Sequence, residues 1–237
     1  MAQEHSSKQY DLDLETLRSR VLEMGGLVES QILAAINGVA AGDLHALDHV
    51  IAEDHRVNAL EVSIDTDCSH LIARRQPTAG DLRMVLAVIK IVTDLERIGD
   101  EAAKIARMGK QGYAQSRMPR TPIAAIKHMG GIGIGMLRKA LDSLARLDPV
   151  SAAAIVREDF EIDEEFRSIV RQLITFMMED PRTITRSLEI LFISKALERI
   201  GDHSKNMAEY VVYMVEGRDV RHLHSGEERE ARGDKLA

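Results

Sequence analysis

An internal repeat, marked by one hexapeptide, is the strongest constraint on how this chain folds. The string Leu-Glu-Arg-Ile-Gly-Asp occurs at 95–100 and again at 197–202, each time at the same point of a longer helical pattern. Self-similarity of this kind is the signature of a fold built from equivalent units. The sequence therefore predicts two similar halves, each carrying one copy of the hexapeptide.

Helical periodicity runs through both halves. Between Leu14 and Val39, apolar residues recur at steps of three and four, which is the stripe of an amphipathic helix. Turn and capping signals, such as Gly42-Asp43 and Asp148-Pro149, separate six stretches of this kind. The expected helices cover about 14–41, 44–74, 79–110, 121–147, 151–178 and 181–216.

The composition agrees with a helical core. Of 237 residues, 45% are hydrophobic and only 3% are aromatic, so Leu, Ile, Val, Met and Ala must fill the core. These residues suit packed helices better than sheets. We expect an all-α fold of six long helices in two repeated halves, over 10–111 and 120–217. A polar linker over 111–120 joins them, and a charged, disordered tail is expected over 218–237.

Charge and cysteine content restrict the class of protein. The formal net charge of −7 argues against a nucleic-acid binder, which needs a basic excess. Cys68 is the single cysteine, which excludes an intramolecular disulfide and fits a reducing compartment. Residues 1–8 are polar, unlike a signal peptide, and the apolar stretches are too short to span a bilayer. We therefore expect a cytoplasmic protein that does not insert into a membrane.

Each hexapeptide places two carboxylates one helical turn apart on the same face. Glu96 and Asp100 form the first pair, and Glu198 and Asp202 form the second. The carboxylates of a pair repel each other by roughly 0.2–0.5 kcal/mol, and a bound cation would compensate this repulsion. The same side chains could instead be solvated and paired with a nearby lysine, Lys104 for Asp100 or Lys195 for Glu198. The spacing alone leaves both interpretations open.

The remaining motifs give no sign of catalysis. Four glycines interrupt the fourth predicted helix, at Gly130, Gly131, Gly133 and Gly135. They have no preceding strand and no Gly-Lys-Ser/Thr ending, so close helix–helix contact or local flexibility is expected rather than a phosphate loop. No Ser/His/Asp, Cys/His or nucleotide-binding signature stands out, and we expect no enzymatic activity.

Three segments of the chain resemble the PhoU family of bacterial phosphate-signalling regulators. They are ARRQPTAGDLRMVLAVIKIVTDLERIGDEAAKIA at 73–106, ALERIGDHSKNMAEYVVYMVEG at 196–217 and EMGGLVESQI at 23–32. The resemblance implies that the two halves are tandem pseudo-symmetric three-helix bundles. It implies a homodimeric negative regulator of the phosphate-starvation response and of phosphate uptake. It also implies two partners, which are the ATPase subunit of the phosphate ABC transporter and a sensor histidine kinase.

The resemblance further implies cations, Fe, Zn, Mn or Mg, bound by carboxylates. The family motif falls on the two hexapeptide pairs, and the implied ligands from the neighbouring helices are Asp54, Asp159 and Asp163, with Asn58 at the fourth position. An amide oxygen can bind a cation but brings no charge, so we expect the first-half site to be the weaker one. Arg97 and Arg199 lie one step round the helix, and each is expected to form ion pairs with another helix.

Two other functions fit the residues without the family. One is a metalloenzyme that uses carboxylate-bound metal for hydrolysis or redox chemistry. The other is a helical scaffold, unrelated to phosphate, whose acidic faces bind basic partners. Bound metal with turnover would support the first, whereas salt-sensitive association without metal would support the second.

Overall fold

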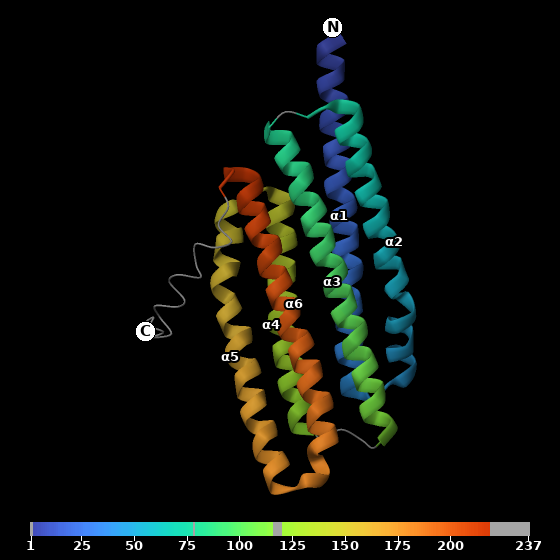
Figure 1. Cartoon of the computed structure of the whole chain (residues 1–237), viewed down its shortest axis with the longest axis vertical. Coiled ribbons are helices and arrows are strands. Elements are labelled where there is room, and N and C mark those ends of the chain that lie inside the picture. The colour runs from blue at the N-terminus through green and yellow to red at the C-terminus, as the bar shows by residue number, and fades with distance from the viewer. Residues whose placement is uncertain (1, 78, 116–119, 219–237) are drawn as a thin grey trace, which may run out of the picture.

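The computed structural model describes residues 2–77, 79–115 and 120–218, and long helices account for nearly all of them (Figure 1). The helices are α1 (Ala2–Ala41), α2 (Leu44–Arg75), α3 (Ala79–Gln115), α4 (Arg120–Arg146), α5 (Pro149–Glu179) and α6 (Ile184–Glu216), with a short 3-10 turn, η1 (Pro181–Thr183), before α6. The described residues contain no strand. The predicted all-α class is confirmed.

Local capping explains several helix ends. The Asp43 carboxylate accepts a hydrogen bond from the backbone N–H of Ala46 at 3.0 Å, which caps the first turn of α2. Asp148 caps α5 in the same way, and Pro149 is the first residue of that helix. At the end of α6, Gly217 adopts a left-handed φ of 72°. These ends lie where the turn signals of the sequence predict them.

The sequence-based expectation misplaces three helix boundaries in particular. α1 begins at Ala2, well ahead of position 14. α3 continues to Gln115 and does not end near position 110. Tyr113 holds this last turn, since its hydroxyl donates a hydrogen bond to the Val39 carbonyl of α1 at 2.6 Å. α4 begins at Arg120, just ahead of the expected start at position 121. Of the expected linker and tail, 116–119 and 219–237 lie outside the described residues.

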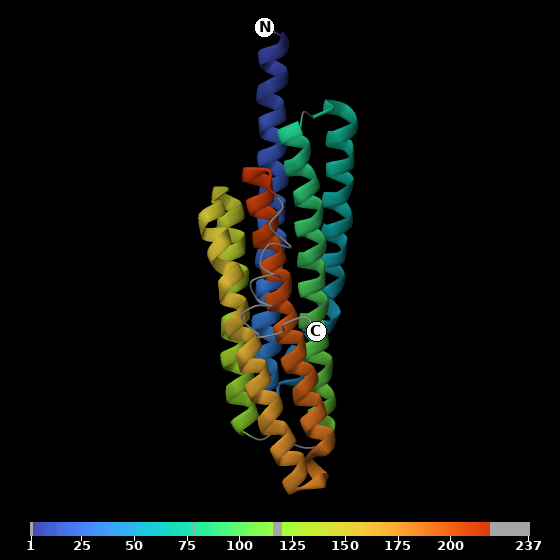
Figure 2. The same cartoon turned by 60° about the vertical axis from the view of Figure 1, so that its left-hand side comes forward.

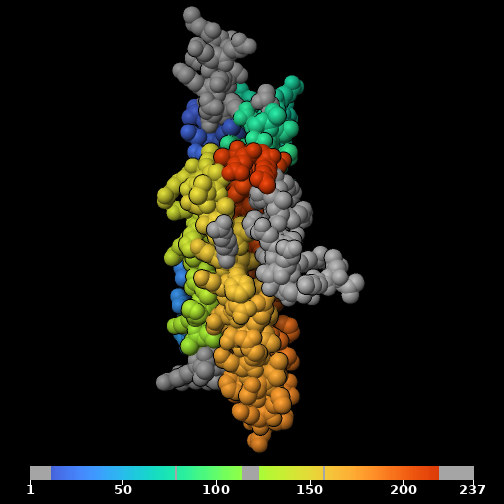
Figure 3. All heavy atoms as spheres, turned by 90° about the vertical axis from the view of Figure 1, so that its left-hand side faces the viewer, coloured from blue at the N-terminus to red at the C-terminus, as the bar shows by residue number. Residues whose placement is uncertain are grey.

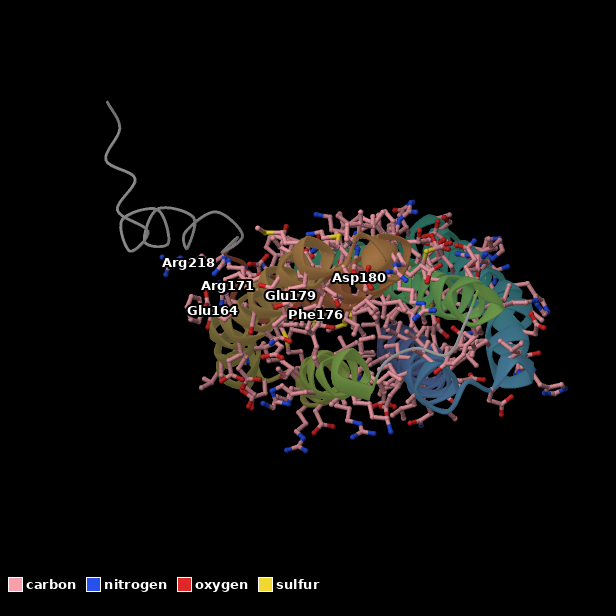
Figure 4. The ribbon with its side chains drawn as sticks, turned by 90° about the horizontal axis from the view of Figure 1, so that it is seen from below. Glu164, Arg171, Phe176, Glu179, Asp180 and Arg218 are labelled. Atoms are coloured by element: carbon pink, nitrogen blue, oxygen red, sulfur yellow. The ribbon has the colours of Figure 1, made fainter. Side chains whose placement is uncertain are left out.

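The two halves of the chain form two three-helix bundles that pack side by side (Figures 1 and 2). α3 contacts α6, and α1 contacts α4, so these four helices form the centre of the molecule. α2 packs on α1 and α3, whereas α5 packs on α4 and α6. The end-on view shows the same division, with α2 and α5 on opposite flanks (Figure 4).

α1 is a core helix, although it is long and apolar. Among the described residues, one helical stretch, Leu12–Ala41, is long and apolar enough to cross a membrane by length and composition. Half of its most apolar window is buried inside the protein. Val21, Val28 and Ile32 have no exposed surface, because this stripe packs against neighbouring helices. Burial in the bundle thus accounts for the apolar character of α1.

Glycines allow α1 and α4 to approach each other closely. A Cβ atom on Gly25 of α1 would overlap with Leu141 of α4, and a Cβ atom on Gly130 of α4 would overlap with Ile36 of α1. The two contacts are equivalent under the pseudo-symmetry of the halves. Gly131, in contrast, faces open space. Close helix–helix contact therefore explains Gly130, as the sequence predicted, but not Gly131.

Replacing each of these neighbouring glycines by leucine tests the packing. Gly130→Leu should lower the free energy of unfolding by about 1–3 kcal/mol, because the new side chain overfills the contact with Ile36. Gly131→Leu should raise it by about 0.5–1 kcal/mol, because leucine favours the helix. Urea denaturation of both variants measures the difference. Equal stabilities would contradict the close packing at Gly130.

Candidate carboxylate clusters

The two copies of the hexapeptide lie back to back where α3 packs on α6. His203 Nδ1 lies 2.7 Å from Asp94 Oδ1, and the Asn206 amide donates a hydrogen bond to the same oxygen at 3.4 Å. Glu101, directly after the first copy, forms an ion pair with Arg199 of the second copy. We call these contacts the α3–α6 seam. They join the two copies through the sides of the helices that do not carry the acidic pairs.

The acidic pairs face away from the seam, toward α2 in one half and α5 in the other. Residues that influence one another electrostatically define two groups. The first cluster comprises Asp54 and Glu61 of α2 with Glu96 and Asp100 of α3. The second cluster comprises Asp159 and Asp163 of α5 with Glu198 and Asp202 of α6. The structure thus brings together all seven acids that were expected as ligands, in two separate groups.

The carboxylates of the first cluster are partly desolvated and close to one another. Burial raises the pKa of Asp54, and the nearby Asp100 carboxylate raises it further. The same two causes raise the pKa of Glu96. The Oδ1 atom of Asp54 is buried and has no hydrogen-bond partner in the part of the chain that the structure describes. The cluster therefore carries negative charge that the surrounding protein only partly satisfies.

Glu61 is a member of this cluster that the sequence reasoning missed. The expected fourth position was 58, but Asn58 is exposed on α2. Glu61 lies seven residues after Asp54, which is about two helical turns, so both side chains lie on the same side of α2. Burial and the Asp65 and Asp100 carboxylates raise the pKa of Glu61, which Arg97 opposes. A search for acids seven residues apart, as well as four, could have found it.

Basic side chains satisfy much of the second cluster. Three of its carboxylates each have a close basic partner, namely Lys205 with Asp159 at 2.8 Å, Arg167 with Asp163 at 3.1 Å and Lys195 with Glu198 at 2.6 Å. The lysine pairing expected for Glu198 is therefore present, whereas in the first half Lys104 pairs with Glu101 at 3.2 Å and not with Asp100. Asp202 differs, because burial and then the carboxylates of Glu198 and Asp159 raise its pKa to about 6.

The two arginines of the hexapeptides have different partners. Arg199 reaches across to Glu101 on α3, as expected for an ion pair with another helix. Arg97 stays with its own helix, where its guanidinium lies 3.5 Å from both Glu96 and Asp100. The expected ion pair between Arg97 and another helix is therefore wrong, because both partners of Arg97 lie on α3. The reason is that α6 offers His203 at the position that corresponds to Glu101, so there is no equivalent acid on the other side of the seam.

A cation fits the donor set of these clusters. Carboxylate oxygens are ligands of hard and borderline cations, and buried oxygens without partners are present on both Asp54 and Asp159. Across 2–77, 79–115 and 120–218, however, no three His, Cys, Asp or Glu side chains are already arranged around a common metal position. The carboxylates would have to rotate toward the ion, and in the second cluster they would have to leave their lysine and arginine partners.

The other candidate ligands do not belong to a site of this kind. His45 and His49 are exposed on α2. Burial raises the pKa of the Cys68 thiol to about 12, which keeps it protonated. Open surface grooves of about 430 Å³ and 470 Å³ lie between α1 and α2 and between α4 and α5, and are lined by residues outside both clusters. Glu164 and Arg171 line the second groove, on the outer edge of α5 (Figure 4). Figure 3 shows the molecule from the side on which α5 faces the viewer.

Comparison with known proteins identifies the family. The profile of the PhoU domain matches residues 21–108 and again 126–211. The chain belongs to the PhoU family. The "Phosphate-specific transport system accessory protein PhoU homolog" of a Burkholderia species is 45% identical over 227 residues, which cover 94% of this chain and 95% of that protein. The PhoU protein of Escherichia coli K12, with the same accessory-protein description, is 43% identical over 223 residues, covering 94% and 92%.

Solved PhoU structures share the six-helix fold. The crystal structure of PhoU from Pseudomonas aeruginosa has a TM-score of 0.85 and 42% sequence identity, and the match covers 88% of this chain and 100% of that chain. The structure of the phosphate transport system regulatory protein PhoU from Streptococcus pneumoniae has a TM-score of 0.82 at 28% identity, covering 89% and 99%. The two matches of the domain profile agree with the repeat seen in the sequence and in the fold.

The raised pKa of Asp202 predicts a stability that depends on pH in the metal-free protein. Because its pKa is about 6 in the folded chain and 3.8 ordinarily, its neutral carboxyl contributes stability below about pH 4. This contribution is lost as the pH rises through about 6. Asp202→Asn should therefore raise the free energy of unfolding at pH 7 by ~1 kcal/mol. This figure is reduced for screening, because Asp202 keeps an exposed surface although α5 and α6 partly desolvate its carboxylate.

Urea denaturation in the presence of a chelator, between pH 4 and pH 7, measures this effect. Asp142→Asn is the control, because Asp142 is a surface residue paired with Arg146 outside both clusters. The Asp202→Asn variant should lose stability less steeply than the wild-type protein between about pH 4 and 6. Parallel pH profiles of stability for the wild-type protein and Asp202→Asn would contradict the raised pKa of Asp202.

Proposed function

We propose that this protein is a cytoplasmic negative regulator of the phosphate-starvation response. In this role it acts as an adaptor between the phosphate ABC transporter, at its ATPase subunit, and the sensor histidine kinase. The observation that carries the proposal is similarity over nearly the whole chain to accessory proteins of phosphate-specific transport systems. The relatives are described as accessory or regulatory proteins, which favours an adaptor over an enzyme.

The arrangement of the helices leaves the outer helices of both halves open to contact with a partner. That partner would be a second copy of the chain, the ATPase subunit or the kinase. The outer surfaces of α2 and α5 are not covered by the other half of the chain in the described ranges. The acidic clusters lie beside these outer helices. A change in the net charge of a cluster would therefore change how closely α2 or α5 packs on its neighbour. A shift of an outer helix would then signal to a partner bound on that helix.

We also propose that the clusters bind divalent or iron cations. Asp54, Glu61, Glu96 and Asp100 would hold a cation between α2 and α3, and the second cluster would hold one between α5 and α6. The bound charge would offset carboxylate repulsion and clamp each outer helix to its neighbour. The first cluster has Arg97 as its one close ion-pair partner among the described residues, whereas three basic side chains compete in the second. This balance favours the first cluster, in contrast to the expectation from Asn58.

Deletion of the gene tests the regulatory role. Deletion should raise expression of phosphate-starvation genes in cells grown at high phosphate, because the negative regulator is absent. A reporter for one such gene measures the effect, and complementation with the wild-type chain should restore repression. Unchanged reporter expression in the deletion strain would overturn the proposed regulatory function.

Metal analysis of paired variants tests the cation sites. Glu96→Ala with Asp100→Ala should abolish binding at the first cluster, and Glu198→Ala with Asp202→Ala should do the same at the second, because each removes two carboxylate ligands. Inductively coupled plasma mass spectrometry, after dialysis against Mn²⁺, Zn²⁺ or Fe²⁺, gives the amount of metal bound per chain. Asp142→Ala serves as the surface control. Equal metal content in all variants would place the cation elsewhere.

A further inference from the structure

Gln31 of α1 is a buried amide without a partner. Its side chain is only 5% exposed. Neither Oε1 nor Nε2 forms a hydrogen bond to any residue in the described ranges. A buried polar group left in this state destabilises the folded protein, so its presence calls for an explanation.

The amide lies beneath the first cluster. Oε1 of Gln31 is 3.6 Å from the point where a Cβ atom on Gly99 would lie, and Val57 Cγ1 is 3.2 Å from the same point. Gly99 separates Glu96 from Asp100 along α3, and Val57 lies between Asp54 and Glu61 along α2. We call Gln31, Val57 and Gly99 the floor of the first cluster. The missing side chain at Gly99 leaves the Gln31 oxygen next to the backbone that carries the acidic pair.

The second half shows that the fold does not require an amide at this position. In the register that places Asp54 on Asp159, Gln31 corresponds to Met136 and Val57 to Ile162. Met136 Sδ lies 3.5 Å and Ile162 Cγ2 lies 3.0 Å from the point where a Cβ atom on Gly201 would lie. The equivalent floor is therefore apolar and well packed. The polar floor is specific to the first cluster, which is also the one with fewer basic partners.

We propose that Gln31 holds a divalent cation in the first cluster, with Oε1 bound either to the ion or to a water molecule coordinated by it. The proposal rests on the cation sites proposed above and adds a neutral ligand from a third helix, α1. An amide oxygen is a hard donor that suits Mg²⁺ or Mn²⁺. It also adds no charge to a cluster of four carboxylates in which burial and neighbouring carboxylates already raise the pKa of Asp54, Glu61 and Glu96. A bound ion would thus satisfy both the amide and the buried oxygen of Asp54.

Gln31→Met, which copies the residue at Met136, provides the test. Both it and its matched control, Met136→Leu, are made in a chain whose second cluster is disabled by Glu198→Ala and Asp202→Ala. Calorimetry with Mn²⁺ gives the affinity of the first cluster, and thermal melts with chelator give the stability of the metal-free chain. Gln31→Met should weaken Mn²⁺ binding by about 10–100-fold. It should also raise the metal-free midpoint by roughly 2–4 °C, because an unpartnered amide is removed.

The control and a third variant separate this role from simple packing. Met136→Leu should leave the Mn²⁺ affinity unchanged. Gln31→Glu keeps an oxygen at the same reach and should bind Mn²⁺ at least as tightly as the parent chain. Weakened binding in Gln31→Glu, or unchanged binding in Gln31→Met, would overturn the role of Gln31 while leaving the cluster as a cation site.

Two further outcomes would also overturn the proposal. A lower metal-free midpoint in Gln31→Met would show that a buried water already satisfies the amide, so that Gln31 has a structural role. Failure of the parent chain to bind Mn²⁺ at all would remove both the first cation site and the role of Gln31. The regulatory function would stand in that case, because the gene-deletion experiment tests it separately.

Discussion

The packing of α3 on α6 determines where every other feature of this protein lies. The seam contains few polar contacts, chiefly Asp94 with His203 and Glu101 with Arg199. These contacts are partly or fully shielded from water, where an unmatched charge would be costly, so they favour one register of the two helices. With that register set, the acidic face of each helix must point outward. The clusters therefore form beside α2 and α5, on opposite flanks of the molecule.

The same hexapeptide acquires different surroundings in the two halves. In the first, Arg97 remains near Glu96 and Asp100, and the floor contains the Gln31 amide. In the second, lysines and an arginine from α5 and α6 approach the carboxylates, and the floor is apolar. Identical residues at identical spacing thus differ in charge compensation. The duplication produced two equivalent three-helix units, and differences in residues outside the hexapeptide made the two clusters unequal.

This geometry connects the proposed cation sites with the proposed role as a regulator. A cation in either cluster would draw an outer helix onto α3 or α6, which are the helices that share the seam. The clusters and the seam lie on different sides of the same two helices, α3 and α6. A cation bound in one cluster can therefore change how the other half of the chain packs at the seam, because the helix between them is rigid. Such linkage requires that a cation bind two arrangements of the seam with different affinities, as in any conformational switch.

The sequence by itself determined the helices, their caps, the duplication, the acidic pairs and the family, because each depends on local spacing or on long stretches of similar residues. It could not place Glu61 in the first cluster ahead of Asn58, since that choice depends on which side of α2 meets α3. It could not assign Arg97 and Arg199 to different partners, because the two lie in identical strings. Nor could it reveal the unpartnered Gln31 amide. These features were decided by tertiary structure, since burial and charge compensation arise only when helices distant in sequence pack together.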